Sequence, residues 1–307
     1  MKQSSHIPVL INDVLRLLNP QPGETYFDGT AGLGGHAAEV LEQMGPSGQA
    51  ILADRDVQAI TQLATRFEPL GPRVAIWHTD YLAAAGQLIE SNRAVDMILL
   101  DLGVSSSQLD RAERGFSFTH DGPLDMRMDQ TLLRSAADIV NTVSEKELAD
   151  LIYEYGEERK SRRIAKAIVR ERPIHTTSAL AAVVRSAAGP SKDTIHPATR
   201  TFQALRIVVN EELYQLEQAL PLLTALLNPG GRIVVISFHS LEDRLVKVYF
   251  RRESRDCICP PRQPICTCGH TASLKLLTNR PLTGITDAFN PRARSAKLRA
   301  AVKLTQK

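Results

Sequence analysis

Short apolar runs alternate with helical segments through the first hundred residues of the chain. The runs fall at residues 26–28, 49–54, 73–78 and 95–100, and Gly- and Pro-containing turns separate several of them. Short strands with few polar positions are typical of a parallel sheet that helices cover on both faces. This part of the sequence therefore predicts repeated strand–helix–strand units in a doubly wound α/β fold.

The pattern becomes helical between residue 108 and about residue 195. Ser144 and Glu147 have the spacing of a capping box ahead of an apolar helix, and Gly156 lies where that helix would end. Thr177 is placed to cap a second helix, which Gly189 would end. We find no convincing buried strand in this segment. It predicts a helical insertion of roughly 85–90 residues, which suits a substrate-binding lobe.

Strand patterns return in the last third of the chain. Residues 232–238 form a fifth apolar run directly after a Pro-Gly-Gly turn. Residues 296–304 alternate between apolar and mostly basic side chains, which predicts an antiparallel strand near the sheet edge with one face in solvent. The expected organisation is the first part of an α/β domain at residues 1–107, the helical insertion at 108–195, and the second part of the domain at 196–307.

The composition is that of an ordinary globular protein with a slight excess of positive charge. Hydrophobic residues make up 43% and charged residues 23% of the chain, and the formal net charge is +3. This charge is compatible with an anionic partner but does not require one. The apolar stretch near the N-terminus is too short for a signal peptide, and no run approaches the length of a membrane span. We therefore expect a cytoplasmic protein.

A glycine-rich segment, Asp28-Gly-Thr-Ala-Gly-Leu-Gly-Gly-His36, directly follows the first apolar run. Glycines here allow a tight turn and the close approach of a ligand at the start of a helix. The spacing differs from the Gly-x-Gly-x-x-Gly of dinucleotide-binding proteins, which seats a pyrophosphate. It favours S-adenosylmethionine instead, with Asp54 at the end of the second strand as acceptor for ribose hydroxyls. Asp56 competes for this role, and either residue could instead cap the next helix.

Two further residues follow the fourth and fifth apolar runs, where open α/β sheets place their chemistry. We assign Asp101 as the first candidate for a catalytic proton acceptor, although it could simply cap the next turn. His239 is the second candidate, and capping a turn is the slightly favoured alternative for it. The Gly-x-Ser-x-Gly motif of serine hydrolases is absent from the sequence around His239.

Basic and aromatic residues point to a nucleic-acid substrate. Four basic residues are spaced to share one face of a helix and could contact phosphates, although a solvated face is a common alternative. Other basic residues near the C-terminus add positive charge, and three phenylalanines could either hold a target base turned out of its stack or belong to the core. The three sets are Arg159, Arg163, Lys166 and Arg170; Arg251, Arg252, Arg255, Arg292, Arg294 and Lys297; and Phe116, Phe118 and Phe202.

All four cysteines lie in two Cys-x-Cys pairs, Cys257 with Cys259 and Cys266 with Cys268. Such crowding argues against a disulfide scaffold, which connects distant segments. Four thiolates could bind a tetrahedral zinc ion, but the usual spacing in zinc sites is Cys-x₂₋₄-Cys. Reduced thiols in a surface loop are the favoured interpretation, so no metal ligand is assigned from the sequence.

Motifs spread over nearly the whole chain closely resemble the ribosomal small-subunit methyltransferase H family, also called MraW. Beside the glycine-rich segment they include His6-Ile-Pro-Val-Leu10, Asp101-Leu-Gly-Val-Ser-Ser106, Gly122-Pro-Leu-Asp-Met-Arg-Met-Asp129, His196-Pro-Ala-Thr-Arg-Thr-Phe-Gln-Ala-Leu-Arg-Ile207, Ser237-Phe-His-Ser-Leu-Glu-Asp-Arg244 and Asn290-Pro-Arg-Ala-Arg-Ser-Ala-Lys-Leu-Arg299. They occur in the order typical of that family, and several are long enough to be specific.

This resemblance implies a class I methyltransferase domain that carries a helical insertion. The implied reaction is N4-methylation of a cytidine in the decoding region of 16S ribosomal RNA, within the 30S subunit, and neither DNA nor a membrane is an expected partner. The implied methyl donor is S-adenosylmethionine. The paired cysteines occur in only some relatives, so the resemblance lends zinc little support. The cofactor contacts that it implies are Gly34, Gly35, His36, Asp54, Tyr81, Asp101 and Gln108.

Three other functions are weighed against this one. The first is methyl transfer to DNA or to a small molecule. Only the family resemblance favours ribosomal RNA over these substrates. The second is an NAD(P)-dependent oxidoreductase, which the glycine spacing disfavours. The third is a non-catalytic RNA-binding factor, against which the intact glycine-rich segment with Asp54 and Asp101 argues.

Overall fold

The computed structural model describes residues 7–190, 195–263, 265–284 and 291–305, apart from the side chains of Pro291 and Arg292. His6, Asn290 and the side chain of Arg292 therefore lie outside the described part of the chain. The chain divides into two compact units. We call Met1–Gly103 with Gln215–Lys307 the sheet unit, and Val104–Tyr214 the helical unit.

One mixed sheet forms the centre of the sheet unit. Its strands lie in the order β3-β2-β1-β4-β5-β8-β6, with β7 paired to β8. Neighbouring strands from β3 to β5 run parallel, whereas β8 runs antiparallel to β5, β6 and β7. The strand order reverses between β1 and β4, and this is where doubly wound sheets bind ligands. The bounds are β1 Thr25–Asp28, β2 Gln49–Asp54, β3 Val74–His78, β4 Val95–Asp101, β5 Leu227–Ser237, β6 Leu274–Leu276, β7 Leu282–Thr283 and β8 Lys297–Lys303.

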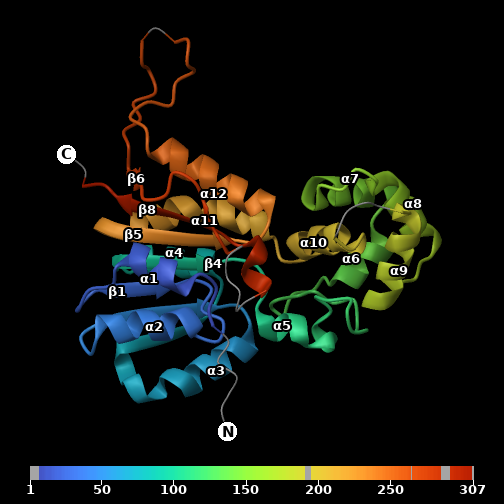
Figure 1. The fold of residues 1–307 in the computed structure, drawn as a ribbon, viewed down its shortest axis with the longest axis horizontal. Coiled ribbons are helices and arrows are strands. Elements are labelled where there is room, and N and C mark those ends of the chain that lie inside the picture. Colours follow the sequence, from blue (N-terminus) through green and yellow to red (C-terminus); the bar gives the residue numbers. More distant parts are fainter. Residues whose placement is uncertain (1–6, 191–194, 264, 285–290, 306–307) are drawn as a thin grey trace. The chain divides into compact units, whose positions relative to one another are not determined.

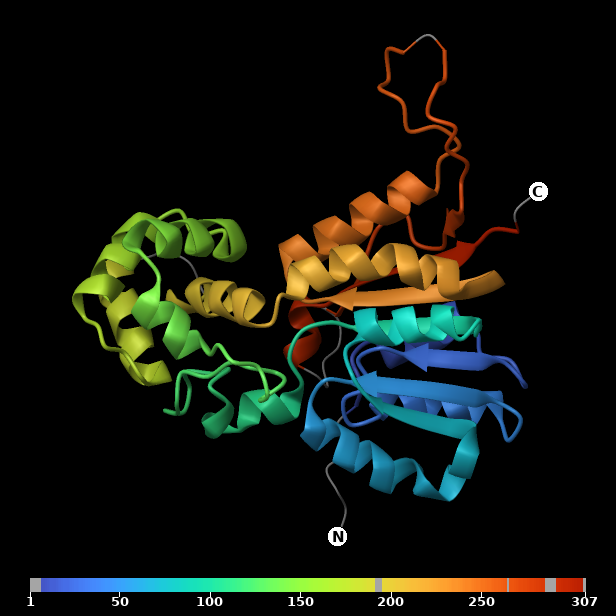
Figure 2. The same cartoon turned by 180° about the vertical axis from the view of Figure 1, so that it is seen from behind.

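Successive residues of the central strands enter two different cores, as strand geometry requires. Ile98 and Leu100 of β4 pack into a core shared with α4, α11 and α12, whereas Met97 and Leu99 pack into a core shared with α1, α2 and α3. Helices therefore cover both faces of the sheet (Figures 1 and 2), which confirms the predicted doubly wound α/β class. These helices are α1 Ile11–Leu18, α2 Gly35–Met44, α3 Val57–Phe67, α4 Tyr81–Glu90, α11 Glu212–Leu226 and α12 Ser240–Glu253.

Two details of the C-terminal strands differ from the sequence predictions. Strand β5 begins at Leu227, and its pairing with β4 shifts register between Val95 and Met97, so the Pro-Gly-Gly segment lies within the strand. Strand β8 is antiparallel as predicted, but the expectation of one solvent-exposed face was wrong. Arg299 is buried because its guanidinium donates a 2.6 Å hydrogen bond to the Asp243 carboxylate of α12.

The helical unit has its own apolar core, to which α6–α10 contribute. Ser144 accepts a hydrogen bond from the Glu147 N–H, so the predicted cap of α7 is confirmed. The cap of α9 is Thr176 rather than Thr177, because the Thr177 hydroxyl accepts a hydrogen bond from the Gly122 N–H instead. The helices are α5 Ser106–Asp110, α6 Ala136–Thr142, α7 Glu145–Gly156, α8 Ser161–Arg170, α9 Thr177–Ala188 and α10 Ala198–Val209. Among the described residues of both units, 3₁₀ segments include Glu68–Arg73, Ala112–Arg114 and Pro291–Ser295.

The helical unit extends beyond the insertion expected at residues 108–195. It runs from Val104 to Tyr214 and so includes α10. Phe202, Leu205 and Val209 of α10 belong to the core of this unit, which explains the later boundary. No helix in the described part of the chain has both the length and the apolar character that crossing a bilayer requires.

Candidate functional site

Two carboxylates end the adjacent strands at the reversal point of the sheet: Asp28 ends β1 and Asp101 ends β4. Thr30 connects them. Its backbone N–H donates a 3.1 Å hydrogen bond to Asp28 Oδ1, and its hydroxyl oxygen accepts a 2.6 Å hydrogen bond from the Asp101 N–H. The Gly29 N–H donates to the Leu99 carbonyl at 3.1 Å. The start of the glycine-rich segment is thereby fixed against both strands.

The carboxyl group of Asp101 has one buried oxygen. Oδ1 is buried and has no hydrogen-bond partner among the described residues, although the side chain as a whole is 24% exposed. Burial, together with the smaller effect of the negative charge of Glu242, raises the pKa of Asp101 from 3.8 to about 7. A buried acceptor without a partner is uncommon and often marks a functional site. Asp101 can therefore gain or lose a proton near neutral pH.

His36 links this carboxyl group to the N-terminal segment. Its Nε2 atom lies 2.9 Å from the Val9 carbonyl oxygen, and its Nδ1 atom lies 3.7 Å from Asp101 Oδ2. Burial lowers the pKa of His36, which favours the neutral ring. A neutral ring that donates from Nε2 to Val9 presents an acceptor lone pair at Nδ1. His36 thus lies beside Asp101 as an acceptor and also holds the segment before α1.

A buried pair at β1 was missed by the sequence reasoning. The Tyr26 hydroxyl donates a 2.8 Å hydrogen bond to Asp28 Oδ2. Burial raises the pKa of Asp28 to about 6 and raises the pKa of Tyr26 as well. The signal in the sequence was a tyrosine and an aspartate on the same face of a short, otherwise apolar strand.

Asp54 lies at the end of β2 against the glycine-rich segment. Its Oδ2 accepts a hydrogen bond from the Gly32 N–H and its Oδ1 accepts one from the Asp56 N–H, both at 2.8 Å. Asp56 itself caps α3 by accepting from the Gln58 N–H at 3.0 Å. The two aspartates therefore have separate structural roles, and the helix cap is Asp56.

Gly32 leaves open space beside Asp54. Its φ is +53°, a conformation that favours glycine. Apart from its two chain neighbours, the group nearest to a Cβ atom at residue 32 would be the Thr30 carbonyl oxygen, at 3.9 Å. A side chain at residue 32 would therefore occupy space into which a ligand could fit. The backbone of Gly32 and the carboxylate of Asp54 therefore form an open cradle that offers hydrogen-bond acceptors to a ligand.

The remaining predicted contacts in the sheet unit serve internal packing. A Cβ atom on Gly34 would lie 2.5 Å from the Phe67 ring, and one on Gly35 would lie 2.9 Å from Pro8. Tyr81 is buried at the start of α4, and a Cβ atom on Gly29 would lie 2.6 Å from Tyr81 Cβ. Close packing thus explains Gly34, Gly35 and Tyr81, while their contacts with a cofactor stay predictions.

His239 is the N-cap of α12. Its Nδ1 accepts a hydrogen bond from the Glu242 N–H at 3.4 Å, and Glu242 Oε2 accepts one from the Phe238 N–H at 2.8 Å. His239 Nε2 also lies 3.1 Å from Glu242 Oε1. His239 therefore has a structural role at the start of α12, while its predicted catalytic role stays a prediction. Glu242 was missed, although its position three residues after His239 is the spacing of a capping box.

Gln108 belongs to the helical unit, where it completes the capping box of α5. Its side-chain oxygen accepts a 2.9 Å hydrogen bond from the Ser105 N–H, and the Ser105 hydroxyl accepts one from the Gln108 N–H at 3.2 Å. This local contact explains its burial in the helical unit. The predicted contact of Gln108 with a cofactor stays a prediction.

The predicted basic helix face forms on α8. Ile164 and Ile168 are buried, while Arg163, Lys166 and Arg170 are exposed, as the spacing predicts. Arg159 is also exposed but precedes the first residue of the helix. One face of α8 therefore presents cations to solvent, while the opposite face packs into the core of the helical unit.

The three candidate phenylalanines differ in accessibility. Phe116 and Phe202 are buried in the core of the helical unit, so they are core residues. Phe118 is half-buried, with its ring centroid 4.9 Å from that of Phe202 and 4.6 Å from the ring of His196. Of the three, only Phe118 has exposed ring surface that a base could contact.

Comparison with known proteins gives a single family. Residues 3–304 match the model of the MraW methylase family. The chain is 51% identical over 312 residues to Ribosomal RNA small subunit methyltransferase H of Citrifermentans bemidjiense, with 99% of this chain and 100% of that protein covered. It is 45% identical over 308 residues to the protein of the same name from Heliobacterium modesticaldum, with 97% and 98% covered.

The solved structure of an rRNA methylase from Streptococcus thermophilus aligns with 96% of this chain and 94% of its own chain, at 9% identity and a TM-score of 0.42. This structural similarity is too low to support a functional argument. The match over nearly all residues and the identity to full-length relatives decide the assignment. The chain belongs to the MraW methylase family, the family of the ribosomal RNA small subunit methyltransferase H proteins.

Proposed function

We propose that this chain transfers a methyl group from S-adenosylmethionine to N4 of a cytidine in the decoding region of 16S ribosomal RNA. Membership of the MraW methylase family and the names of its relatives support methyl transfer to ribosomal RNA of the small subunit. The observation that best supports chemistry at this site is the carboxyl group of Asp101. It ends a strand at the reversal point, keeps a buried oxygen without a partner among the described residues, and has a pKa of about 7.

The cradle at Gly32 and Asp54 fits the proposed donor. S-adenosylmethionine carries two ribose hydroxyls, and each oxygen of the Asp54 carboxylate keeps acceptor capacity beyond the one N–H that it receives here. The open space at Gly32 allows a ligand to approach the backbone. S-adenosylmethionine has no pyrophosphate, which agrees with a turn that lacks the dinucleotide-binding spacing. When bound, it supplies a methyl group on a positively charged sulfur.

Asp101 is the proton acceptor in the proposed reaction. The lone pair of the cytidine N4 is delocalised into the ring, so removing a proton from N4 makes it a better nucleophile. The Asp101 carboxylate accepts this proton while the bond between N4 and the methyl carbon forms and the bond between sulfur and that carbon breaks. A pKa of about 7 suits a group that must be ionised before the reaction and protonated after it. His36 lies beside this carboxyl group, with Nδ1 3.7 Å from Oδ2.

The basic face of α8 supports a polyanionic substrate. Arg163, Lys166 and Arg170 are exposed on it and can contact RNA phosphates. Phe118 can stack on a base turned out of its helix, since this residue is only half-buried. The helical unit is large for the recognition of a single nucleotide, and an assembled 30S particle offers a structured surface of matching size.

The test is methyl transfer from radiolabelled S-adenosylmethionine to 30S subunits isolated from cells that lack this modification, followed by nucleoside analysis. We expect label in N4-methylcytidine with the wild-type chain, little with Asp101→Asn, and none on fully modified 30S subunits or on DNA. Donor binding by both variants is measured separately by calorimetry. Donor binding without label on any ribosomal substrate would overturn the target, and failure to bind the donor would overturn the cofactor.

A further inference from the structure

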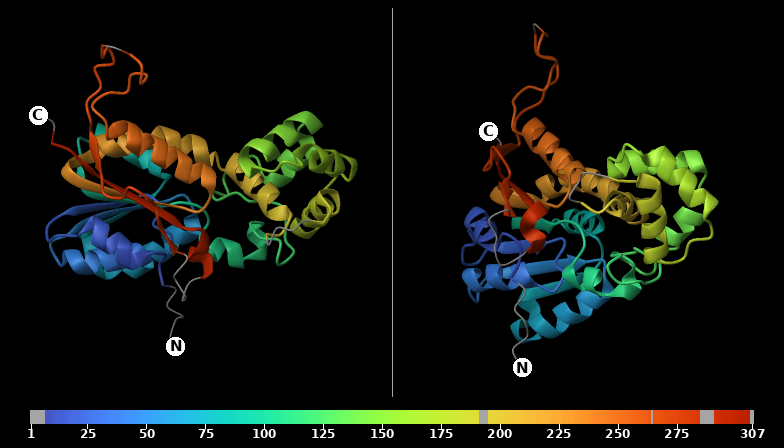
Figure 3. Two further views of the ribbon diagram at one scale, coloured as in Figure 1. Left: turned by 45° about the horizontal axis from the view of Figure 1, so that its top comes forward. Right: turned by 45° about the vertical axis from the view of Figure 1, so that its right-hand side comes forward.

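The segment between α12 and β6 has no core of its own. The described residues from 254 to 273 form no helix or strand, and none of their side chains is buried. Figure 3 shows the segment leaving the body of the sheet unit as a long loop. Hydrogen bonds close its base, including one from the Ser273 N–H to the Glu253 carbonyl at 2.9 Å. A long loop without buried apolar surface needs another source of order above that base.

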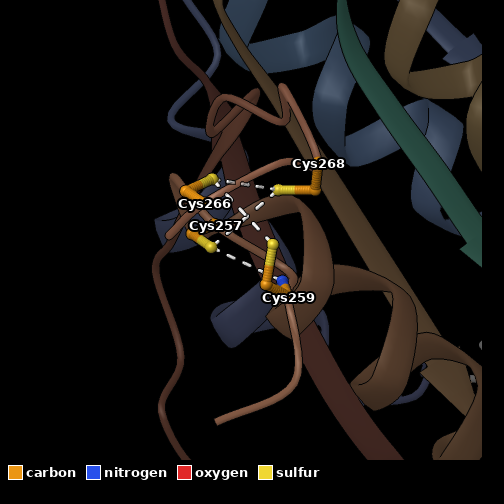
Figure 4. A group of neighbouring side chains, drawn as sticks. All are labelled: Cys257, Cys259, Cys266 and Cys268. Atoms are coloured by element: carbon orange, nitrogen blue, oxygen red, sulfur yellow. Dashed lines mark hydrogen bonds between the residues drawn. The ribbon is translucent and has the colours of Figure 1, made fainter. Parts of the chain in front are cut away.

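The four cysteines gather in this loop. Cys257 and Cys259 lie on its outgoing branch, and Cys266 and Cys268 lie on its returning branch. All four sulfur atoms lie within 4.8 Å of one another, and Figure 4 shows the side chains converging on a common centre. The sulfur atoms are 3.6 Å apart in Cys266 and Cys268, 3.8 Å apart in Cys257 and Cys268, and 3.9 Å apart in Cys259 and Cys266.

These separations match the edges of a tetrahedron around zinc. With zinc–sulfur bonds of about 2.3 Å, two ligands of a tetrahedral site lie about 3.8 Å apart. A disulfide would bring two sulfurs to about 2.05 Å and would leave the other pair apart. We propose that Cys257, Cys259, Cys266 and Cys268 bind one Zn²⁺ ion in a closed four-thiolate site. This replaces the interpretation of unliganded thiols that the short Cys-x-Cys spacing favoured.

Backbone geometry accounts for the short spacing. The Cys259 N–H donates to the sulfur of Cys257 at 3.4 Å, and the Ile258 N–H donates to the sulfur of Cys268 at 3.5 Å. Such donors stabilise thiolate charge and orient metal ligands. One contact lies within the first Cys-x-Cys pair and the other connects the two branches. A turn with a single intervening residue can thus present two sulfurs to the same ion.

Charge balance also favours a cation at this centre. Four thiols that bind one Zn²⁺ release four protons, which leaves the site with a charge of −2. Arg255 and Arg262 are exposed in the same loop, and Arg251 and Arg252 lie in the last turn of α12. These positive side chains, in the loop or directly before it, are compatible with the negative charge of such a site. Without a metal the cysteines would keep their protons, so binding should become tighter as the pH rises.

The site is structural rather than catalytic. Four protein ligands leave no open position for a water molecule or a substrate, as in other structural zinc sites. None of the four cysteines ends a strand at the reversal point of the sheet, so methyl transfer does not need the ion for its chemistry. Zinc instead supplies free energy that orders the loop, because none of the side chains that the structure describes in it is buried.

Metal analysis of the purified full-length chain, made without a metal-binding tag, tests the proposal. We expect about one zinc per chain in the wild type and nearly none in Cys266→Ser/Cys268→Ser. The matched control, Ile265→Ser/Thr267→Ser, changes exposed neighbours in the same loop and should keep its zinc. Donor binding and a thermal melt show that each variant retains a folded sheet unit.

A second measurement needs no variant. The wild-type chain is stripped with a chelator and titrated with Co²⁺, which should produce the strong visible absorption of tetrahedral cobalt thiolates at one equivalent; added Zn²⁺ should remove that absorption. The chelated chain should also become open to proteolysis within residues 254–273. A chain that contains no zinc, takes up neither ion and shows four reactive thiols with or without zinc would overturn the proposal. Stoichiometric iron with sulfide would overturn the choice of metal.

Discussion

The Nδ1 atom of His36 lies 3.7 Å from Oδ2 of Asp101, while the other ring nitrogen of His36 lies 2.9 Å from the Val9 carbonyl oxygen. Burial lowers the pKa of His36 and raises that of Asp101 to about 7. A proton near neutral pH therefore resides on the carboxyl group rather than on the imidazole. The residue pair provides a carboxylate whose charge can change under cellular conditions without forming a buried imidazolium.

The rate of methyl transfer should depend on the ionisation of Asp101. Only the carboxylate can accept a proton, so kcat should rise with pH through about 7. Glu242→Gln removes the neighbouring negative charge and should move this rise to lower pH. Asp101→Asn should lower kcat by roughly 10²–10⁴-fold and abolish the rise. Single-turnover rates between pH 5.5 and 9 provide the check, and an unchanged profile in Asp101→Asn would assign proton transfer elsewhere.

Asp101 should also make folding stability fall as the pH rises. Its pKa is 3.8 as an ordinary carboxyl and about 7 in the folded chain, so the folded chain binds the proton more tightly. The stabilisation from the neutral group is complete below about pH 4 and is lost as the pH rises through 7. Asp101→Asn should therefore be more stable than the wild type at pH 8, on the order of 2–4 kcal/mol, but not at pH 4. Urea unfolding at both pH values measures this, and an equal difference at both would contradict it.

A side chain at residue 32 should interfere with the methyl donor. Gly32→Ala fills the open space beside Asp54 and should weaken donor binding by about tenfold or more, measured by calorimetry. Gly71→Ala is the matched control, since Gly71 has a similar φ of +59° and nothing near its Cβ position. Both variants place an alanine at a positive φ. Equal losses of affinity would mean that strain, and not the filled cradle, is responsible.

His239 should act through α12 and not through proton transfer. His239→Ala removes the N-cap and should lower the free energy of unfolding by about 1 kcal/mol. Asparagine is among the best capping residues, so His239→Asn should recover most of this stability and most of kcat. The comparison needs chemical denaturation and single-turnover rates. A well-folded His239→Asn with a hundredfold lower rate would identify the histidine as the proton acceptor.

The basic face of α8 should govern the salt dependence of RNA binding. Combined Arg163→Ala, Lys166→Ala and Arg170→Ala substitutions should weaken binding to 30S subunits and make the dependence of log K on log salt shallower by about one for each lost phosphate contact. Donor affinity should not change. Arg16→Ala, on the exposed surface of α1, is the control. An unaltered salt slope in the triple variant would show that this face is only solvated.

The sequence predicted most strands of the sheet and several helix ends because these depend on local patterns. The run at residues 95–100 becomes a buried strand since both of its faces are apolar, and Ser144 caps α7 as its spacing predicts. Asp54 and Asp101 could likewise be located because strand ends determine where chemistry lies in such sheets.

Features that depend on packing between distant segments could not be predicted from local sequence patterns. The basic side chain of Arg299 suggested a solvent-facing position, but a carboxylate on α12, distant in sequence, buries it. Asp28 and Tyr26 were not recognised as a pair, because the sequence does not show that β2 and β4 enclose β1 on both sides. The convergence of four sulfurs also depends on the fold of the loop, which Cys-x-Cys spacing alone does not determine.

The central pair β4 and β5 has a consequence for synthesis of the chain. These strands are hydrogen-bonded neighbours, yet the whole helical unit separates them in the sequence. On the translating ribosome, β4 is therefore made long before β5, and one edge of this apolar strand stays unpaired in the meantime. Nascent chains that end between β4 and β5 should be the most prone to aggregation and the most dependent on chaperones. Folding of the helical unit as a separate domain would shorten the effective loop that β5 must close.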